Sequence, residues 1–266
     1  MEKVSALFEE LYRIPSASNR AFIPKLNKIL AAESSDMRGS VMQGIWRGCL
    51  DQCLLCAKKE HVVDKMIDFL ALFVSAVSTD DTVYISCIEH LSDRLKAVNK
   101  VIRLRACQMM LRVIIGTMES DKLVSDDTLR KMADILLPRL KDKVPGVRVL
   151  AVRALGNLQA EGDGINEEIL RLLQRDSSKE VRIAAVDCIC LTKITLPIII
   201  ARVKDVKPEV RIAVYSRLAA KGMVNAKVLC DYKSPFISYS RSSNKSPFAN
   251  MSRNIHRTWM LLLRLQ

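Results

Sequence analysis

One pattern occurs three times between residues 136 and 221, and it constrains the fold more than any other feature. Each copy has an apolar stretch, a short polar turn with an aspartate and, five and six residues after the aspartate, a valine and an arginine. A fainter upstream copy keeps Arg103 but has Ala97 in place of the aspartate. Arg148 and Arg182 are 34 residues apart, and Arg182 and Arg211 are 29 apart. Such a period is typical of a stacked repeat array.

Each copy is predicted to form two helices joined by the polar turn. Pro145 and Pro208 come near the start of the second helix in two copies, where the missing N–H of proline costs no hydrogen bond. After Pro145, apolar residues recur at i, i+4, i+5 and i+8 from Val147, which is the one-sided pattern of a helix. A helix pair of this kind buries its apolar face only when neighbours stack on it. The sequence therefore predicts an all-α protein, an α-solenoid.

The third copy resembles the HEAT-repeat family, because Pro197, Asp205, Val210 and Arg211 stand at the spacings of that family's pattern. The resemblance implies a HEAT-repeat α-solenoid, an armadillo-like superhelix. It also implies that the aspartates and arginines of successive repeats form a ladder, so their first role is expected to be structural. The ladder residues are Asp142, Arg148, Asp176, Arg182, Asp205 and Arg211.

Charge is distributed unevenly along the chain. Residues 1–99 carry 12 Lys and Arg against 13 Asp and Glu, whereas residues 100–221 carry 23 against 15. Residues 222–266 carry 7 against 1, and the whole chain has a formal net charge of +13. A basic balance concentrated on a repeat array suggests a polyanionic partner, most simply nucleic acid.

Several classes of protein are disfavoured by composition and termini. No apolar run approaches the roughly 20 residues needed to span a bilayer, so we expect no membrane association. The amino terminus lacks the basic and apolar regions of a signal peptide. The 8 cysteines are therefore expected to be reduced thiols and not a disulfide framework.

The remaining chain is predicted to be helical up to its basic end. We expect degenerate helical repeats over 1–99, clear HEAT repeats over 100–228 and a disordered Ser- and Lys-rich tail over 229–266. Helices are expected at about 44–59, 61–77, 84–97 and 100–117, after two helices within 1–32, and the longest break inside the clear repeats at 160–168.

A more specific resemblance is to condensin complex subunit 3, the CAP-G type HEAT subunit of condensin. It rests on the segments 7–15, 23–33, 62–81 and 101–107, and most of all on 195–211, which reads TLPIIIARVKDVKPEVR. The resemblance covers roughly residues 5–228. It implies a non-catalytic condensin subunit that holds the CAP-H type kleisin on its repeats, joins the SMC subunits through the complex and clamps double-stranded DNA in mitotic chromosome condensation. It further implies location in the nucleus and on chromosomes, with the cytoplasm in interphase as an alternative.

The carboxyl-terminal tail departs from that family. Family members are several times longer and continue with further helices, so we expect the tail to come from a truncated or alternatively spliced transcript, or from a gene-model error. Ser234 and Ser246 each lie in the context KSPF and are candidate sites for proline-directed phosphorylation.

Cysteine chemistry is the sharpest alternative. Cys49, Cys53 and Cys56 have the CxxxCxxC spacing of radical-SAM iron–sulfur sites, but on a helix they form one stripe, where free cysteine packs as a small apolar residue. His61 and His90 are expected on helix surfaces and match no zinc pattern. No nucleotide-binding or nucleophile-elbow motif is present. We therefore predict no cofactor, no metal, no small-molecule substrate and no catalytic residue.

Cations beside the intra-repeat turns are the candidate DNA-binding residues. They recur at matching positions of each repeat, so stacking would align them along one edge, where they could follow a phosphate backbone without reading bases. One alternative is that these cations form only a solvated basic face. Another is a HEAT adaptor that binds only proteins, such as a transport receptor or phosphatase scaffold. The candidates are Lys141, Lys143, Arg175, Lys179, Lys204 and Lys207, with Arg103 and Arg105 as an extension.

Overall fold

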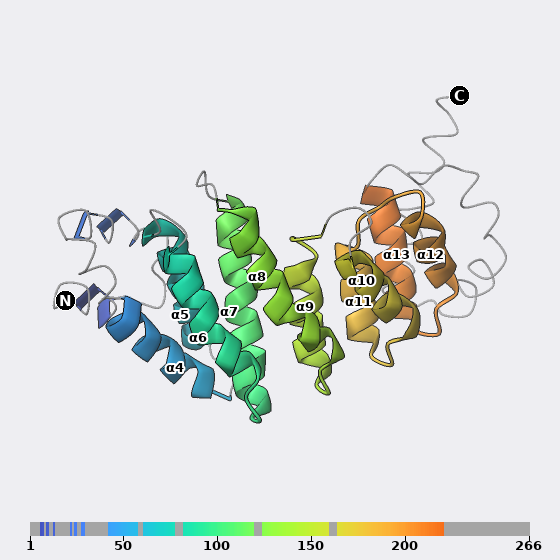
Figure 1. Cartoon of the computed structure of the whole chain (residues 1–266). Helices are drawn as coiled ribbons and strands as arrows, with labels where there is room; N and C mark the ends of the chain where they lie inside the picture. The colour runs from blue at the N-terminus through green and yellow to red at the C-terminus, as the bar shows by residue number, and fades with distance from the viewer. Residues whose placement is uncertain are drawn as a thin grey trace. The chain divides into compact units, whose positions relative to one another are not determined.

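A computed structural model describes residues 42–57, 61–77, 82–119, 124–159 and 164–220, with single residues and pairs between 6 and 29. Every regular element in these parts is a helix (Figure 1). The chain divides into two compact units, Met1–Thr192 and Lys193–Gln266. The predicted tail, with Ser234 and Ser246, and most of the two helices expected within 1–32 lie outside the described residues.

The described part of the first unit is a row of helices. In chain order the helices are η1 (Met42–Trp46, a π-turn), α4 (Arg47–Leu55), α5 (His61–Val77), α6 (Thr82–Leu95), α7 (Lys100–Glu119), α8 (Asp126–Leu136), η2 (Leu137–Lys141, a 3₁₀ turn), α9 (Pro145–Leu155), α10 (Gly164–Arg175) and α11 (Lys179–Cys188).

Successive repeats pack through their second helices. α7 packs against α5 on one side and α9 on the other, and α9 packs in turn against α11 (Figure 1). The first helices α6, α8 and α10 each pack beside the second helix that follows them. This pairing and stacking confirms the predicted α-solenoid.

The sequence pattern explains the local geometry of α9. Pro145 is its first residue, and the buried residues Val147, Ala151 and Leu155 form the predicted stripe. A Cβ atom at Gly156 would lie 2.6 Å from the Cβ of Cys188, so the close approach of α9 and α11 requires glycine at this position.

The second unit repeats this design once within its described part. It contains α12 (Thr195–Ala201), the 3₁₀ turn η3 (Arg202–Lys204) and α13 (Pro208–Ala220). α13 begins at its proline and buries Val210, Val214 and Leu218, one apolar face at helical spacing. The most clearly HEAT-like stretch of sequence thus forms the expected helix pair.

Some predicted boundaries were wrong. The helix expected at 44–59 is formed by η1 and α4 and ends at Leu55, and α10 begins at Gly164 within the predicted break 160–168. Among the described residues, no helix is long and apolar enough to cross a bilayer.

Candidate nucleic-acid interface

The ladder aspartates close the intra-repeat turns. The Oδ1 atom of Asp142 accepts a hydrogen bond from the N–H of Val144 at 2.9 Å, and Asp176 accepts one from Ser178 at 2.8 Å. Short carboxylate side chains favour this bond to the backbone two residues on. In the second unit, Asp205 accepts in the same way from the N–H of its own turn at 2.9 Å.

The ladder residue Arg148, and Arg103 in the faint upstream copy, each bind two turns at once. Arg148 donates from Nη1 to the carbonyl oxygen of Asp142 at 2.8 Å, and from Nε and Nη2 to the carboxylate of Asp176, both at 2.8 Å. Arg103 donates to the carbonyl oxygens of Ala97 and Val98 at 2.8 Å and to the Asp142 carboxylate at 2.7 and 3.1 Å. The arginine therefore ties its own turn to the aspartate of the next repeat.

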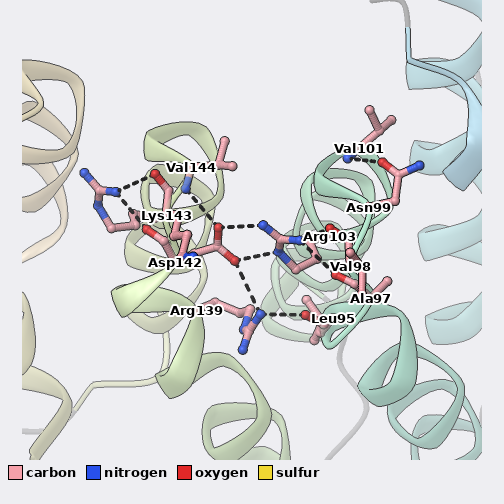
Figure 2. A network of polar contacts seen from close by, with 11 residues as sticks. Leu95, Ala97, Val98, Asn99, Val101, Arg103, Arg139, Asp142, Lys143 and Val144 are labelled. Atoms are coloured by element: carbon pink, nitrogen blue, oxygen red, sulfur yellow. Dashed lines mark hydrogen bonds and ion pairs between the residues drawn. The ribbon is translucent and has the colours of Figure 1, made fainter.

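Asp142 lies between two guanidinium groups, as Figure 2 shows. Its side chain is 3% exposed, and Arg139 contacts it at 3.3 Å while also donating to the Leu95 carbonyl at 2.7 Å. Burial alone would raise the pKa of Asp142, but hydrogen bonds from Arg103 and from the Val144 N–H outweigh it and lower that pKa. The carboxylate is thus held ionised.

The own-turn contact recurs in the last two copies. Arg182 is buried and donates to the carbonyl oxygen of Asp176 at 2.7 Å, and Arg211 in the second unit donates to that of Asp205 at 2.7 Å. The predicted ladder residues therefore lie at the turns, and their arginines already hold backbone carbonyls of the chain.

Arg103 and Arg105 do not lie on an exposed edge, contrary to the predicted extension. The Arg103 side chain is 13% exposed and pairs with Asp142. Arg105 is 6% exposed, because its Nη1 pairs with Asp64 at 2.6 Å and its Nε donates to the carbonyl of Cys56. Arg103 is thus neutralised by a carboxylate of the η2–α9 turn and Arg105 by one on α5.

The other candidate cations lie at the turns as predicted, and they differ in exposure and pairing. Lys143 and Arg175 are exposed, and Lys179 is half-buried. Lys141 is 64% exposed and pairs with Glu168 at 3.1 Å. In the second unit, the lysines on either side of Asp205 and Val206 are exposed: Lys204 and Lys207.

Two further exposed cations lie at the α6–α7 turn, Lys96 and Lys100. Lys96 comes directly before Ala97, just as Lys141 comes directly before Asp142. The repeat register could have found it, because the residue before the ladder position is basic in all four copies. In this copy the two arginines pair with carboxylates, whereas Lys96 is exposed.

The cysteine stripe lies along α4 and the residue that follows its end. Cys49 and Cys53 lie on α4, and Cys56 follows its end with extended backbone. Burial raises the pKa of the Cys53 thiol to about 12, in keeping with a cysteine packed as a small apolar residue. Among the described residues, no group of three or more His, Cys, Asp or Glu is arranged to hold a metal ion.

His90 is buried, and its predicted surface position is wrong. Its Nε2 lies 3.0 Å from Oδ1 of Asp51, and its ring packs edge-on against Trp46 with centroids 6.0 Å apart. Arg94 binds the same carboxylate at 3.0 and 3.2 Å. His61, in contrast, is exposed as predicted.

Comparison with known proteins identifies what this arrangement resembles. No family model matches the chain. Condensin complex subunit 3 of Xenopus laevis is 32% identical over 187 residues, which is 65% of this chain and 18% of that protein. The chain resembles condensin complex subunit 3. The protein of that name from Schizosaccharomyces pombe is 34% identical over 179 residues, 65% of this chain and 20% of the relative.

A solved structure agrees with the resemblance to condensin complex subunit 3. The crystal structure of the S. pombe condensin Cnd3–Cnd2 subcomplex matches 80% of this chain and 27% of the solved chain, with a TM-score of 0.63 and 28% identity. The chain therefore has the HEAT-type fold of that condensin subunit. It spans about a fifth of the length of the curated relatives.

Proposed function

We propose that the protein is a non-catalytic HEAT-repeat subunit of condensin that binds double-stranded DNA together with the kleisin in mitotic chromosome condensation, in the nucleus and on chromosomes. The SMC subunits of the complex would supply ATP hydrolysis. Residues 1–99 are proposed as amino-terminal, degenerate HEAT repeats and residues 100–228 as clear HEAT repeats.

The observation that carries this proposal is that the turns contain two kinds of cation, arginines paired with carboxylates and exposed cations beside them. Arg103 and Arg148 are committed to carboxylates of the next repeat, so they hold the array together. The neighbouring Lys143 and Arg175 are exposed and add positive charge at the same turns. An edge of this kind attracts phosphates by charge alone, and nothing in it requires a base-specific contact.

The kleisin as partner is supported by the relatives. The similar solved chain was crystallised as a Cnd3–Cnd2 subcomplex of condensin, a complex of two subunits. A repeat array offers an extended surface to a partner segment. This part of the proposal rests on similarity and not on contacts of named residues.

The second candidate is a HEAT adaptor for protein partners alone, such as a transport receptor or phosphatase scaffold. The exposed cations at successive turns favour DNA, because protein docking alone does not require a recurrent basic residue at each turn.

The test is a fluorescence-anisotropy titration of a labelled 30-base-pair duplex with the full chain, alone and with its kleisin, between about 50 and 200 mM salt. The test variant is Lys143→Glu with Lys207→Glu. The control, Arg130→Glu with Lys131→Glu on α8, changes the net charge equally. We expect salt-dependent binding that the test variant weakens at least tenfold more than the control.

Circular dichroism of both variants checks that the helices remain. If wild-type chain with its kleisin shows no salt-dependent DNA binding, the adaptor alternative replaces the proposal. Equal weakening by both variants would mean that DNA responds to net charge and not to the turns.

A further inference from the structure

The α6–α7 turn differs in charge from the turns that follow it. Residues 96–100 read KAVNK and contain two lysines and no carboxylate. The next turns each contain a ladder aspartate, at Asp142 and Asp176. Ala97 takes the aspartate's place here, so the turn carries its lysines without an internal counter-charge.

This turn keeps the arginine contact that the other turns have, and Asn99 adds a cap to it. The Nη1 atom of Arg103 binds the carbonyls of Ala97 and Val98, and Asn99 caps α7 by accepting from the N–H of Val101 at 2.9 Å. Figure 2 shows these contacts on the α7 side of the network. The turn is therefore fixed in shape although its ladder carboxylate is absent.

The two lysines at this turn are open to solvent. Lys96 and Lys100 are exposed, and among the described residues neither pairs with a carboxylate. Val98 between them is 98% exposed, so no other described side chain covers the tip of the turn. Lys141 at the next turn, in contrast, is paired with Glu168.

This difference decides which lysine gains more from a phosphate. A phosphate that approaches Lys141 competes with the carboxylate of Glu168, whereas a phosphate at Lys96 or Lys100 displaces no carboxylate of the described residues. The amino-terminal end of the 20-residue helix α7 adds a favourable partial positive charge beside Lys100. Both effects favour phosphate contact at this turn.

We propose that Lys96 and Lys100 make the α6–α7 turn a principal phosphate-contact point of the DNA-binding edge, stronger per side chain than Lys141. The inference deepens the proposed function and rests on it. The ligand is the phosphodiester backbone of duplex DNA, held without base readout.

The experiment measures the salt slope of duplex binding by the full chain with its kleisin. The slope of log affinity against log salt is negative, and each lost phosphate contact makes it less steep by about 0.9 and costs about eightfold in affinity near 0.1 M salt. Lys96→Gln with Lys100→Gln should make the slope less steep by about 1.8. Lys141→Gln should weaken binding less than either single substitution at Lys96 or Lys100.

The charge-matched control is Arg130→Gln with Lys131→Gln, which removes two cations from the exposed face of α8. Thermal unfolding of each variant reports whether the fold is retained. A salt slope unchanged in Lys96→Gln with Lys100→Gln, beside clear wild-type binding, would overturn this inference and leave the proposed function standing. Absence of wild-type binding would overturn both.

Discussion

Arg148 and Asp176 form a two-pronged ion pair between consecutive repeats, with Nε–Oδ2 and Nη2–Oδ1 distances of 2.8 Å. The two side chains are 11% and 5% exposed. Arg148 also holds the carbonyl of Asp142 in its own turn, so one side chain links the α8–α9 turn to the α10–α11 turn. This ion pair links consecutive repeats, and it leaves few guanidinium N–H groups of Arg148 available to a ligand.

Removing the Arg148–Asp176 ion pair should destabilise the repeat array. Asp176→Ala leaves the Arg148 guanidinium buried without its carboxylate, and we expect a loss of about 3 kcal/mol in the free energy of unfolding. Urea denaturation followed by circular dichroism measures it. A double-mutant cycle with Arg148→Ala should give a coupling above about 1 kcal/mol, against about 0.4 kcal/mol for the exposed pair Lys131–Asp127. Equal couplings would contradict the structural role.

Acid should weaken the array through Asp142. Because its folded-state pKa is lowered, its contribution to stability is full above the unfolded value of about 3.9 and is lost as pH falls through the lower folded value. Asp142→Asn should therefore be clearly less stable than wild type at pH 6, and the gap should narrow at pH 3. Urea midpoints at both pH values test this, with Asp127→Asn on the exposed face of α8 as the control. A gap independent of pH would be inconsistent with the ion pair.

His90 should produce a second pH dependence, at higher pH. Burial lowers its pKa, although Asp51 opposes that shift, while Arg94 and Arg47 support it. The native state then binds fewer protons than the unfolded state, so stability falls as pH drops below about 6.5. His90→Gln should flatten the change in urea midpoint between pH 7.5 and 5.5. A variant with the wild-type slope in this window would show that His90 does not titrate as described.

Gln159 joins the ends of two repeats through its side-chain amide. Its Nε2 donates to the carbonyls of Gly156 and Cys188 at 2.7 and 2.6 Å, and its Oε1 accepts from the N–H of Cys190 at 3.1 Å. Gln159→Ala leaves these backbone groups without this partner and should cost about 1–3 kcal/mol. Thermal unfolding beside Gln52→Ala, an exposed position on α4, provides the comparison. Equal melting temperatures would contradict the role of Gln159.

The helices were largely predictable because their signals are local. The apolar period over residues 61–77 gives the bounds of α5 as the structure has them, and Pro145 marks the start of α9. The turn register also placed the ladder aspartates and arginines at the turns. These features depend on residues within one helix or one turn.

The pairing of charges was not predictable in the same way. In the sequence, both the nearby Asp142 and the distant Asp176 are candidate ion-pair partners of Arg148. The carboxylate of Asp176 is the partner because the repeats stack, and Asp142 contributes only its carbonyl oxygen. Arg105 was expected on the surface, but Asp64 of another helix makes its burial possible. His90 is buried for the same reason, through a carboxylate on α4. Such long-range partners follow from tertiary packing.

The measurement that tests the central claim most directly is lysine footprinting of the full chain with its kleisin, with and without a 30-base-pair duplex. Acetylation rates are read by mass spectrometry. The account predicts that DNA slows acetylation at the turn lysines Lys96, Lys100, Lys143 and Lys207 and leaves Lys131 on α8 unchanged. Equal protection of Lys131 and the turn lysines, or none at the turns, would contradict it.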